Sequence, residues 1–556
     1  MKPEAPEAII PEKRAAAMTA QGLWFNRLIL DDLDVAVAAR PDTLAIIAHR
    51  SESGRSESGT SKSLTYSELD HASRQVAHGL LANGVGAGDV VSFQLPNWWQ
   101  FIALHLGCVR IGAVSNPLMP IFRERELRFM LGHAGSKLFI APRRFRNYDY
   151  TSMAERLRDE LPALDAVFHV GGDAPDTFEE SFLSGDAVTE EQRPGPDDVT
   201  QILYTSGTTG EPKGVMHTAN TLIAALPPLI ERMGLDESDV VLMASPLAHQ
   251  TGFMYGMMMP ILLRGTTVLQ DFWAPGTAAE LMADHGVTFT IASTPFLSDL
   301  ADYDGLSHHD ISRFRIFLSA GAPIPRSLVE RATANLGAHI LSGWGMTENG
   351  CVTCCSPGDP AEKIFGTDGD AVPGMAVAIV DDHGASVAPG VEGALRAQSP
   401  SMFAGYLKRP ELYGVDADGW LDTGDLARMD AQGYIRITGR AKDIVIRGGE
   451  NIPVVEVEEI LYRHPLIREL AIVAMPDARL GERACLFVGL VPDATLTLDE
   501  VIAYLDEQDM AKQYYPERLE VMDALPRTPS GKIQKFVLRE QAAALSSPRS
   551  SPLSSH

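Results

Sequence analysis

The sequence has only five cysteines in 556 residues, and its 47 basic side chains are well outnumbered by 73 acidic ones. So few cysteines exclude a disulfide framework, and the first residues lack the order of a secretory signal peptide, so we expect a cytoplasmic protein. The net charge of -26 argues against nucleic acid or an anionic membrane as a partner, because an acidic surface repels phosphates. The longest strongly apolar run, Phe253 to Leu263, is shorter than the roughly 20 residues that cross a bilayer, so no transmembrane segment is expected.

The length exceeds the size at which one hydrophobic core stops growing, so two or more domains are expected. Short β-branched runs such as Val90 to Leu95 alternate with stretches of helical period such as Pro325 to Leu336. This alternation predicts an α/β fold, with a large N-terminal domain of layered sheets and helices over residues 1–440. Residues 441–556 have strand and helix patterns of their own, enough for a smaller α+β domain. Residues 51–62 and the tail 546–556 are polar and of low complexity, so we expect the first to be mobile and the tail to be disordered.

The stretch from Tyr204 to Val215 has a phosphate-binding pattern directly after an apolar run. Glycines allow backbone angles that turn N–H groups inward, while hydroxyls and one lysine add donors and positive charge. The lysine follows Pro212, unlike in the P-loop of kinases and GTPases. Composition alone leaves a solvated turn as an equal alternative. The residues that carry the phosphate-binding interpretation are Thr205, Ser206, Gly207, Thr208, Thr209, Gly210 and Lys213.

A second cluster, from Gly343 to Glu348, combines an aromatic ring, two glycines, a hydroxyl and a carboxylate. Glu348 is suited to hold Mg²⁺ against phosphates, because Mg²⁺ prefers one or two carboxylates together with phosphate oxygens and water. The Thr347 hydroxyl suits a phosphoryl oxygen, and Trp344 offers a flat face for adenine. Taken alone, this cluster also fits an ordinary loop.

In this order, the two segments resemble the adenylate-forming superfamily, which includes acyl-CoA synthetases, beetle luciferases and the adenylation domains of peptide synthetases. The likeness extends from about residue 30 to about residue 540. It implies a large ATP- and acyl-binding domain followed by a smaller mobile domain. It also implies nucleotide contacts at Gly321, Ala322, Pro323, Trp344, Gly345, Met346, Asp425 and Arg440.

The resemblance implies further roles near and beyond the domain boundary. Asp425 would accept hydrogen bonds from both ribose hydroxyls, which suits a carboxylate. Lys442 matches the hinge about which the small domain turns, and Gly448 and Gly449 match the turn along which the pantetheine arm of coenzyme A passes. Lys532, which would otherwise be a solvated charge in a Ser-Gly turn, matches the catalytic lysine that bridges the carboxylate and the α-phosphate.

The reaction implied is the exchange of ATP pyrophosphate for a carboxylate, followed by attack of the coenzyme A thiol on the acyl-AMP. Two anions must meet, so the site needs positive charge and positioning more than a base or nucleophile. Lys532, Lys213, Thr347 and Glu348 are the candidate catalytic residues, and ATP, Mg²⁺ and coenzyme A are the expected ligands. Lys532 would withdraw for the thiol step as the small domain turns.

The acid is expected to be a small molecule of medium size and low polarity. His249, Phe253 and Met254 match or follow the segment that lines the acyl pocket in the family, although a structural histidine and plain core packing are the alternatives. A tryptophan that closes the acyl tunnel in acetate-activating relatives is replaced by Gly345, which leaves room for a larger tail. The sequence of the phosphate loop together with Met216 to Asn220 resembles that of cyclohexanecarboxylate-CoA ligases. Medium-chain fatty acids and benzoate-like acids are the near alternatives as substrates.

Two further hypotheses about the function of the chain are considered. One is an adenylating enzyme that loads a carrier-protein thiol, and another is an inactive homologue that binds nucleotide or acyl ligand. The Cys351 to Cys355 segment has a Cys-x-x-Cys spacing but no second pair, so packed thiols are favoured over zinc. The turn around Lys532 resembles family sites of lysine acylation, so a lysine acyltransferase is an expected partner, and a homodimer is considered as well.

Overall fold

The computed structural model describes residues 5–51, 59–172, 177–205, 212–321, 324–441, 443–447, 450–477, 479–508, 510–528 and 531–546. Several predicted site residues, and the tail from residue 547, therefore lie outside the described residues. These site residues are Ser206, Gly207, Thr208, Thr209, Gly210, Ala322, Pro323, Lys442, Gly448 and Gly449.

The largest sheet has nine strands, which are parallel from β15 through to β1 and antiparallel at both edges. Its order is β17 (Asp370–Ala371), β16 (Gly350–Cys354), β15 (His339–Met346), β14 (Ile316–Ala320), β13 (Phe289–Ala292), β11 (Val240–Met243), β12 (Thr266–Gln270), β1 (Leu44–Ser51) and β2 (Gly59–Thr65). Because β2 pairs with β1 from Gly59 onward, with Ser51 opposite Gly59, the prediction of a mobile segment over 51–62 is wrong for Ser51 and for residues 59–62, and residues 52–58 lie outside the described residues.

A second sheet of six strands lies in the same large region. Its order is β10 (Lys213–Thr218), β9 (Val199–Thr205), β4 (Val114–Pro117), β3 (Val90–Phe93), β5 (Leu138–Pro142) and β8 (Ala166–Val170), and only the β10–β9 pair is antiparallel. All four residues of β3 are buried, as expected of a parallel strand covered on both faces. A short ladder joins β6 (Arg144–Phe145) to β7 (Tyr148–Asp149).

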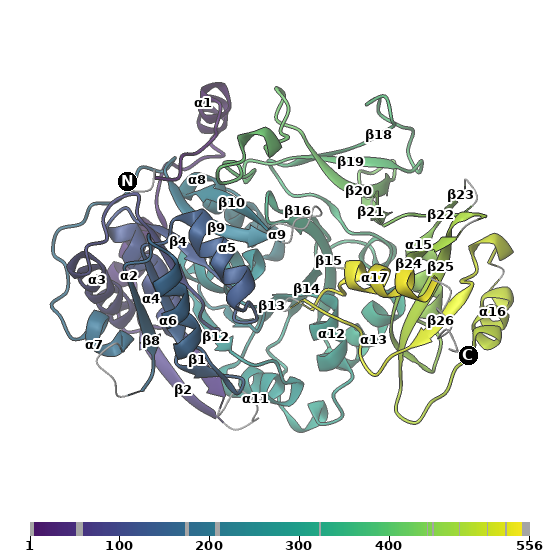
Figure 1. Ribbon diagram of the computed structural model, residues 1–556, viewed down its shortest axis with the longest axis horizontal. Coiled ribbons are helices and arrows are strands. Elements are labelled where there is room, and N and C mark those ends of the chain that lie inside the picture. Colours follow the sequence, from purple (N-terminus) through teal and green to yellow (C-terminus); the bar gives the residue numbers. More distant parts are fainter. Residues whose placement is uncertain are drawn as a thin grey trace, which may run out of the picture.

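Two antiparallel units follow toward the C-terminus. The first has the order β18 (Ala376–Val380), β19 (Gly393–Gln398), β20 (Leu421–Met429) and β21 (Ile435–Arg440). The second has the order β23 (Glu450–Ile452), β22 (Val445–Arg447), β25 (Gly481–Leu490) and β24 (Ile467–Asp477), with β26 (Arg518–Val521) parallel to β25. Figure 1 shows this second unit, with its helices, as a smaller yellow-green body at one end of the molecule.

Helices cover these sheets. In the large region they are α1 (Glu12–Ala20), α2 (Ile29–Ala39), α3 (Tyr66–Ala82), α4 (Trp99–Arg110), α5 (Glu124–Ala134), α6 (Thr151–Glu160), α7 (Phe178–Leu183), α8 (Ala219–Ile223), α9 (Leu226–Met233), the π-helix η2 (Gly252–Met258), α10 (Met259–Leu263), α11 (Pro275–His285), α12 (Thr294–Ala301), η3 (Leu306–His308), α13 (Arg326–Leu336), α14 (Ala361–Gly366) and η4 (Pro410–Leu412). The small domain adds α15 (Val454–Leu461), α16 (Leu498–Glu507), η5 (Lys512–Tyr514) and α17 (Lys535–Ser546).

Local chemistry accounts for how these elements begin and where they lie. Helix α3 starts at a capping box, in which Thr65 and Glu68 each bond the other's backbone N–H. Helix α4 is buried from Gln100 to Arg110, so its polar side chains need partners inside the fold. Arg110 meets Asp70 at 2.6 Å, for example. The fold class predicted from the sequence is confirmed, and among the described residues no helix is long and apolar enough to cross a membrane.

Candidate active site

The predicted phosphate loop joins two paired strands. Strand β9 ends at Thr205 and β10 begins at Lys213, and these residues face each other across the antiparallel ladder. On its other side, β10 contacts a segment around residue 405, where the Met216 N–H donates to the Gly405 carbonyl at 2.9 Å. The Lys213 ammonium lies 4.9 Å from the centre of the Tyr406 ring, a distance at which a cation is attracted to an aromatic face.

Thr347 and Glu348 occupy the turn between β15 and β16. Glu348 is only 8% exposed, and its Oε1 accepts a hydrogen bond from the Tyr406 hydroxyl at 2.8 Å. Burial, followed by the neighbouring carboxylate, raises the pKa of Tyr406, so the hydroxyl stays protonated and acts as a donor. The Glu348 backbone carbonyl accepts from Phe403 N–H at 2.7 Å, so this turn is held through side chain and backbone.

A buried histidine ties the phosphate-loop strand to the same turn. His217 Nε2 lies 2.8 Å from the Thr347 carbonyl oxygen, and its Nδ1 lies 3.0 Å from Thr221 Oγ1. Burial lowers the pKa of His217 to about 4, so the ring is neutral at ordinary pH and its single proton belongs on Nε2, facing the carbonyl. The position of Thr347 is therefore coupled to β10.

The predicted ribose-binding residue is oriented by two neighbours. Asp425 on β20 pairs with Arg440 on β21, with the Arg440 Nε 2.9 Å from Asp425 Oδ1. The indole N–H of Trp344 donates to Asp425 Oδ2 at 2.9 Å. Each carboxylate oxygen has a second lone pair, so both can still accept a bond from a diol. The predicted nucleotide residues Trp344, Asp425 and Arg440 thus lie together.

Lys532 reaches this site from the small domain. It stands in a tight hairpin in which Arg527 bridges Ile533, and the Arg527 guanidinium donates to the Gly531 carbonyl at 2.7 Å. Its Cε lies 3.1 Å from where a Cβ would stand on Gly321, next to β14. Burial, followed by the charge of Arg440, lowers the pKa of Lys532 to about 8, while Asp425 and Glu348 act in the opposite direction. The large and small domains are therefore arranged with Lys532 at the candidate site.

The donor set suits Mg²⁺ held mainly by phosphate. No group of three or more His, Cys, Asp or Glu side chains that could hold a metal ion exists within the described parts of the chain. Glu348 is a single buried carboxylate at the turn where phosphates are expected, and Mg²⁺ commonly takes one carboxylate with phosphate oxygens and water. The role of Glu348 as the protein ligand of Mg²⁺ stays a prediction.

The predicted acyl-pocket residues are mostly buried in the main core. Phe253 and Met254 lie in the buried π-helix η2, and Phe253 packs edge-on against His105 with ring centres 4.7 Å apart. His249 accepts a hydrogen bond from Thr251 N–H at Nδ1, at 3.2 Å. Burial, and then the charge of Lys532, lowers the pKa of His249 to about 3, so the ring is neutral and does not bind the acid as a cation. Their role as a pocket wall stays a prediction.

Two sequence features acquire a structural reason. A Cβ on Gly345 would lie 2.0 Å from the Gly350 carbonyl oxygen, so the β15–β16 hairpin itself requires glycine there, independently of any acyl tunnel. Cys351, Cys354 and Cys355 are buried free thiols, which agrees with the interpretation as packed side chains.

Sequence reasoning missed Tyr406 and His217. Tyr406 lies 58 positions after Glu348 in the chain, and His217 lies 130 positions before Thr347. Neither carries a local signal that distinguishes it from a core residue, so only the folded arrangement shows their contacts with the site.

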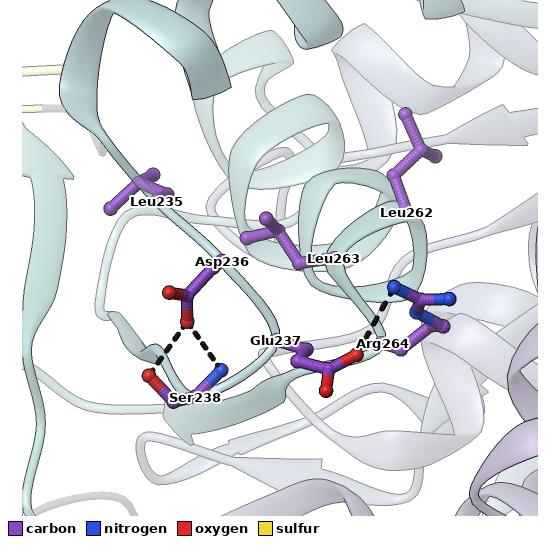
Figure 2. A pocket seen from close by; sticks show the side chains of 7 residues that line it. All are labelled: Leu235, Asp236, Glu237, Ser238, Leu262, Leu263 and Arg264. Carbon is purple, nitrogen blue, oxygen red and sulfur yellow. Dashed lines mark hydrogen bonds and ion pairs between the residues drawn. The ribbon is translucent and has the colours of Figure 1, made fainter.

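A surface pocket elsewhere has different chemistry. Figure 2 shows the seven residues that line it, between α9 and β11 and at the end of α10. Its polar side chains are paired with each other, since Asp236 accepts from Ser238 and Arg264 pairs with Glu237 at 3.1 Å. It contains none of the predicted site residues.

Comparison with known proteins agrees with this geometry. A model of the AMP-binding enzyme family matches residues 33–407, and a model of the AMP-binding enzyme C-terminal domain matches residues 456–532. The chain is 39% identical over 536 residues to the medium-chain fatty-acid–CoA ligase of Escherichia coli strain K12, covering 95% of this chain and 93% of that protein. It is 33% identical to a salicylyl-CoA synthase / salicylate adenylyltransferase of a Streptomyces species, covering 83% of this chain and 86% of that protein.

Solved structures show the same architecture. ATP-bound MatB from Rhodopseudomonas palustris superposes with a TM-score of 0.84 at 27% identity, covering 94% of this chain and all of that one. A fatty acyl CoA synthetase of Mycobacterium tuberculosis gives a TM-score of 0.70 at 26% identity, covering 93% of this chain and 99% of that one. With a family model that matches residues 33–407 and a relative that is 39% identical over 95% of the chain, this chain belongs to the AMP-binding enzyme family.

Proposed function

We propose that this protein is an ATP-dependent acid–CoA ligase that forms an acyl-AMP intermediate and releases pyrophosphate. The observation that carries the proposal is the placement of Lys532, from the small domain, among Glu348, Asp425 and Arg440 of the large domain. A lysine brought into a half-buried acidic site by a separate domain suits a reaction in which two anions must be joined. ATP and coenzyme A are its substrates and Mg²⁺ is its metal ion.

In the first half-reaction, a carboxylate oxygen of the acid attacks the α-phosphorus of ATP, and pyrophosphate leaves with the electrons of the broken P–O bond. Lys532 offsets the charge of the two anions, and Lys213 adds positive charge at the phosphate loop. Asp425, oriented by Trp344 and Arg440, holds the ribose. Glu348 would hold Mg²⁺, which supplies charge neutralisation on the phosphates when it is bound.

In the second half-reaction, the coenzyme A thiol attacks the acyl carbonyl, loses its proton and displaces AMP. Lys532 has no task in this step, and its side chain fills space beside Gly321. We propose that the small domain turns about Lys442 and that Gly448 and Gly449 then form the path of the pantetheine arm, as in the family resemblance. The proposed domain boundary at residues 440–441 follows from the same hinge.

The proposed acid is apolar and of medium size. The Escherichia coli relative is named for medium-chain fatty acids, and the Streptomyces relative for salicylate. Phe253 and Met254, which follow His249 in the chain, are apolar and buried. Together with the neutral ring of His249, they support an apolar acyl group. Medium-chain fatty acids are the first choice on these grounds, and cyclohexanecarboxylate and benzoate-like acids are the next.

The test is pyrophosphate release with ATP and Mg²⁺ across acetate, octanoate, cyclohexanecarboxylate and benzoate, each with and without coenzyme A. Release that depends on octanoate or cyclohexanecarboxylate and accelerates with coenzyme A is expected. Release that coenzyme A leaves unchanged favours transfer to a carrier-protein thiol, and silence with all four acids contradicts the proposed acid class.

Cellular context is part of the proposal. All five cysteines are buried free thiols, which supports a reducing compartment such as the cytoplasm.

Acylation of Lys532 by a lysine acyltransferase would neutralise its charge and stop acyl-AMP formation. A homodimer is proposed as well, and sedimentation of the purified protein tests it.

A further inference from the structure

The segment of residues 400–407 lies between the candidate site and the start of the chain. Its backbone N–H groups face the site: they donate from Phe403 to the Glu348 carbonyl, from Ala404 to the Met216 carbonyl and from Leu407 to the Gly214 carbonyl, at 2.7, 2.8 and 2.8 Å. The same segment supplies Tyr406, which contacts both Glu348 and Lys213. Its position therefore decides how two of the predicted catalytic side chains are oriented.

Three carbonyl groups of this segment, those of Pro400, Met402 and Ala404, accept hydrogen bonds from residues 5–24, which we call the N-terminal strap. The Trp24 indole donates to the Pro400 carbonyl at 2.9 Å, the Arg14 guanidinium to the Met402 carbonyl at 2.7 Å, and the Ile9 N–H to the Ala404 carbonyl at 2.6 Å. Backbone carbonyls that lose such partners inside a fold are costly, so these bonds hold the segment in place.

The strap is not simply a piece of the core. Helix α1, which forms its middle, has no buried residue, and Figure 1 shows it standing clear of the sheets. The strap nevertheless comes close to the 400–407 segment at Ile9, since a Cβ on Gly405 would lie 2.9 Å from the Ile9 side chain. Gly405 also has a φ of +117°, which favours glycine. The second guanidinium arm of Arg14 donates to the Tyr413 hydroxyl at 2.9 Å. The strap also precedes residue 33, where the match to the AMP-binding family model begins.

We propose that the N-terminal strap positions Tyr406, and through it Glu348 and Lys213, for acyl-AMP formation. Arg14 is the central positioning residue, since it joins the strap to the 400–407 segment and to Tyr413. This inference deepens the proposed function, and it rests on that function only for the kinetic part of its test.

The first test is hydrogen exchange of the unliganded protein, followed by mass spectrometry. Arg14→Ala is expected to speed exchange of the amides in residues 402–407 at least tenfold, because the Met402 carbonyl and the Tyr413 hydroxyl both lose the partner that ties them to the strap. Lys13→Ala is the matched control, as it removes a neighbouring basic but exposed side chain. Unchanged exchange in Arg14→Ala, or equal acceleration in Lys13→Ala, would overturn the proposal.

A milder variant covers the case in which Arg14→Ala does not fold. Trp24→Phe keeps an aromatic ring in the buried position and removes only the N–H that bonds Pro400. Faster exchange in the same peptide is expected, and exchange equal to that of the parent protein contradicts the strap's role.

The second test separates positioning from general stability. Arg14→Ala and Tyr406→Phe should each lower acyl-AMP formation about tenfold while leaving thioester formation from supplied acyl-AMP unchanged. The double variant should be no slower than the slower single one, because both changes act on the same contact. Multiplicative losses, or equal losses in both half-reactions, would rule the proposal out. If the parent protein activates none of the acids, the proposed function fails, and the exchange experiment still decides the strap.

Discussion

Lys532 brings positive charge from the small domain into a half-buried site, and its neighbours shift its pKa in opposite directions. Burial and Arg440 lower its pKa, while Asp425 and Glu348 oppose them. The outcome, a pKa of about 8, means that the charge needed to join two anions is present at neutral pH and is lost in mildly alkaline solution. The residue is therefore sensitive both to substitution and to pH.

Replacing Lys532 with alanine should separate the two half-reactions. We expect acyl-AMP formation to fall at least 100-fold, because the charge beside the α-phosphate is lost, while thioester formation from supplied acyl-AMP stays within about twofold. Pyrophosphate release and acyl-CoA formation measure the two steps. Lys512→Ala, at an exposed lysine of the same domain, is the control. Equal loss of both steps would contradict the assigned role.

The pH dependence should follow the same side chain. Lys532 is charged below its pKa, so kcat/KM for acyl-AMP formation should be level below about pH 8 and should fall up to tenfold per unit above it. Lys532→Arg keeps the charge at all these values, so its lower activity should not decline over the same range. Rates from pH 6 to 10 test this, and the idea fails if both proteins show the same alkaline decline.

At the scale of secondary structure elements, the β15–β16 hairpin holds the Thr347–Glu348 turn, and its backbone leaves no space at Gly345. The turn is also tied to neighbouring elements through His217 on β10 and Phe403. The position of this turn, which carries the proposed catalytic residues, therefore depends on how the strands pack, and a change in this packing should reduce the stability of the fold before it alters substrate choice.

Gly345→Ala tests this interpretation of the hairpin. The new Cβ would lie 2.0 Å from the Gly350 carbonyl oxygen, so the backbone must shift, and we expect a loss of about 1–3 kcal/mol in the free energy of unfolding. Gly86→Ala is the matched control, because a Cβ there meets nothing within 4 Å, and it should cost less than about 0.5 kcal/mol. Thermal or urea denaturation measures both. Equal stability of the two variants would mean that the hairpin has room at residue 345.

At the scale of the whole molecule, an ion pair links the small domain to the large one while Lys532 stands at the candidate site. Arg436 on β21 contacts Asp368 at 3.5 Å in the large domain and pairs with Glu459 on α15 of the small domain. This ion pair crosses the proposed hinge, so it would have to break when the small domain turns.

Glu459→Gln should weaken this arrangement. We expect acyl-AMP formation to fall about 3- to 10-fold, because a partly buried pair loses one charge, while the thioester step is unchanged or faster. Glu456→Gln, at an exposed position of the same helix, should leave both steps as in the parent protein. Single-turnover measurements of each half-reaction provide the comparison, and a slower thioester step in Glu459→Gln would contradict the role given to the pair.

Periodicity in the sequence was sufficient for much of the fold. The run from Val90 to Leu95 contains β3, which begins at the same residue, and the helical stretch from Pro325 to Leu336 contains α13, which begins one residue later and ends at the same residue. The prediction of a mobile segment was wrong for residues 59–62, because hydrogen bonding to β1 outweighed their polar composition. Polar composition shows that a segment has little to bury, but an edge strand such as β2 can be held by hydrogen bonds to one neighbouring strand alone.

The family of this protein could be predicted from local patterns in its sequence. The segment from Tyr204 to Val215, the Thr347–Glu348 pair and Lys532 are local patterns, and their order was enough to predict an adenylate-forming enzyme, which the family match confirms. The side chains that hold these groups in place became visible in the folded arrangement alone. Tyr406 against Glu348, His217 against Thr347 and Arg14 against Met402 join residues 58, 130 and 388 positions apart. Such contacts depend on how the elements pack, so the residues next to each partner in the chain give no signal that predicts them.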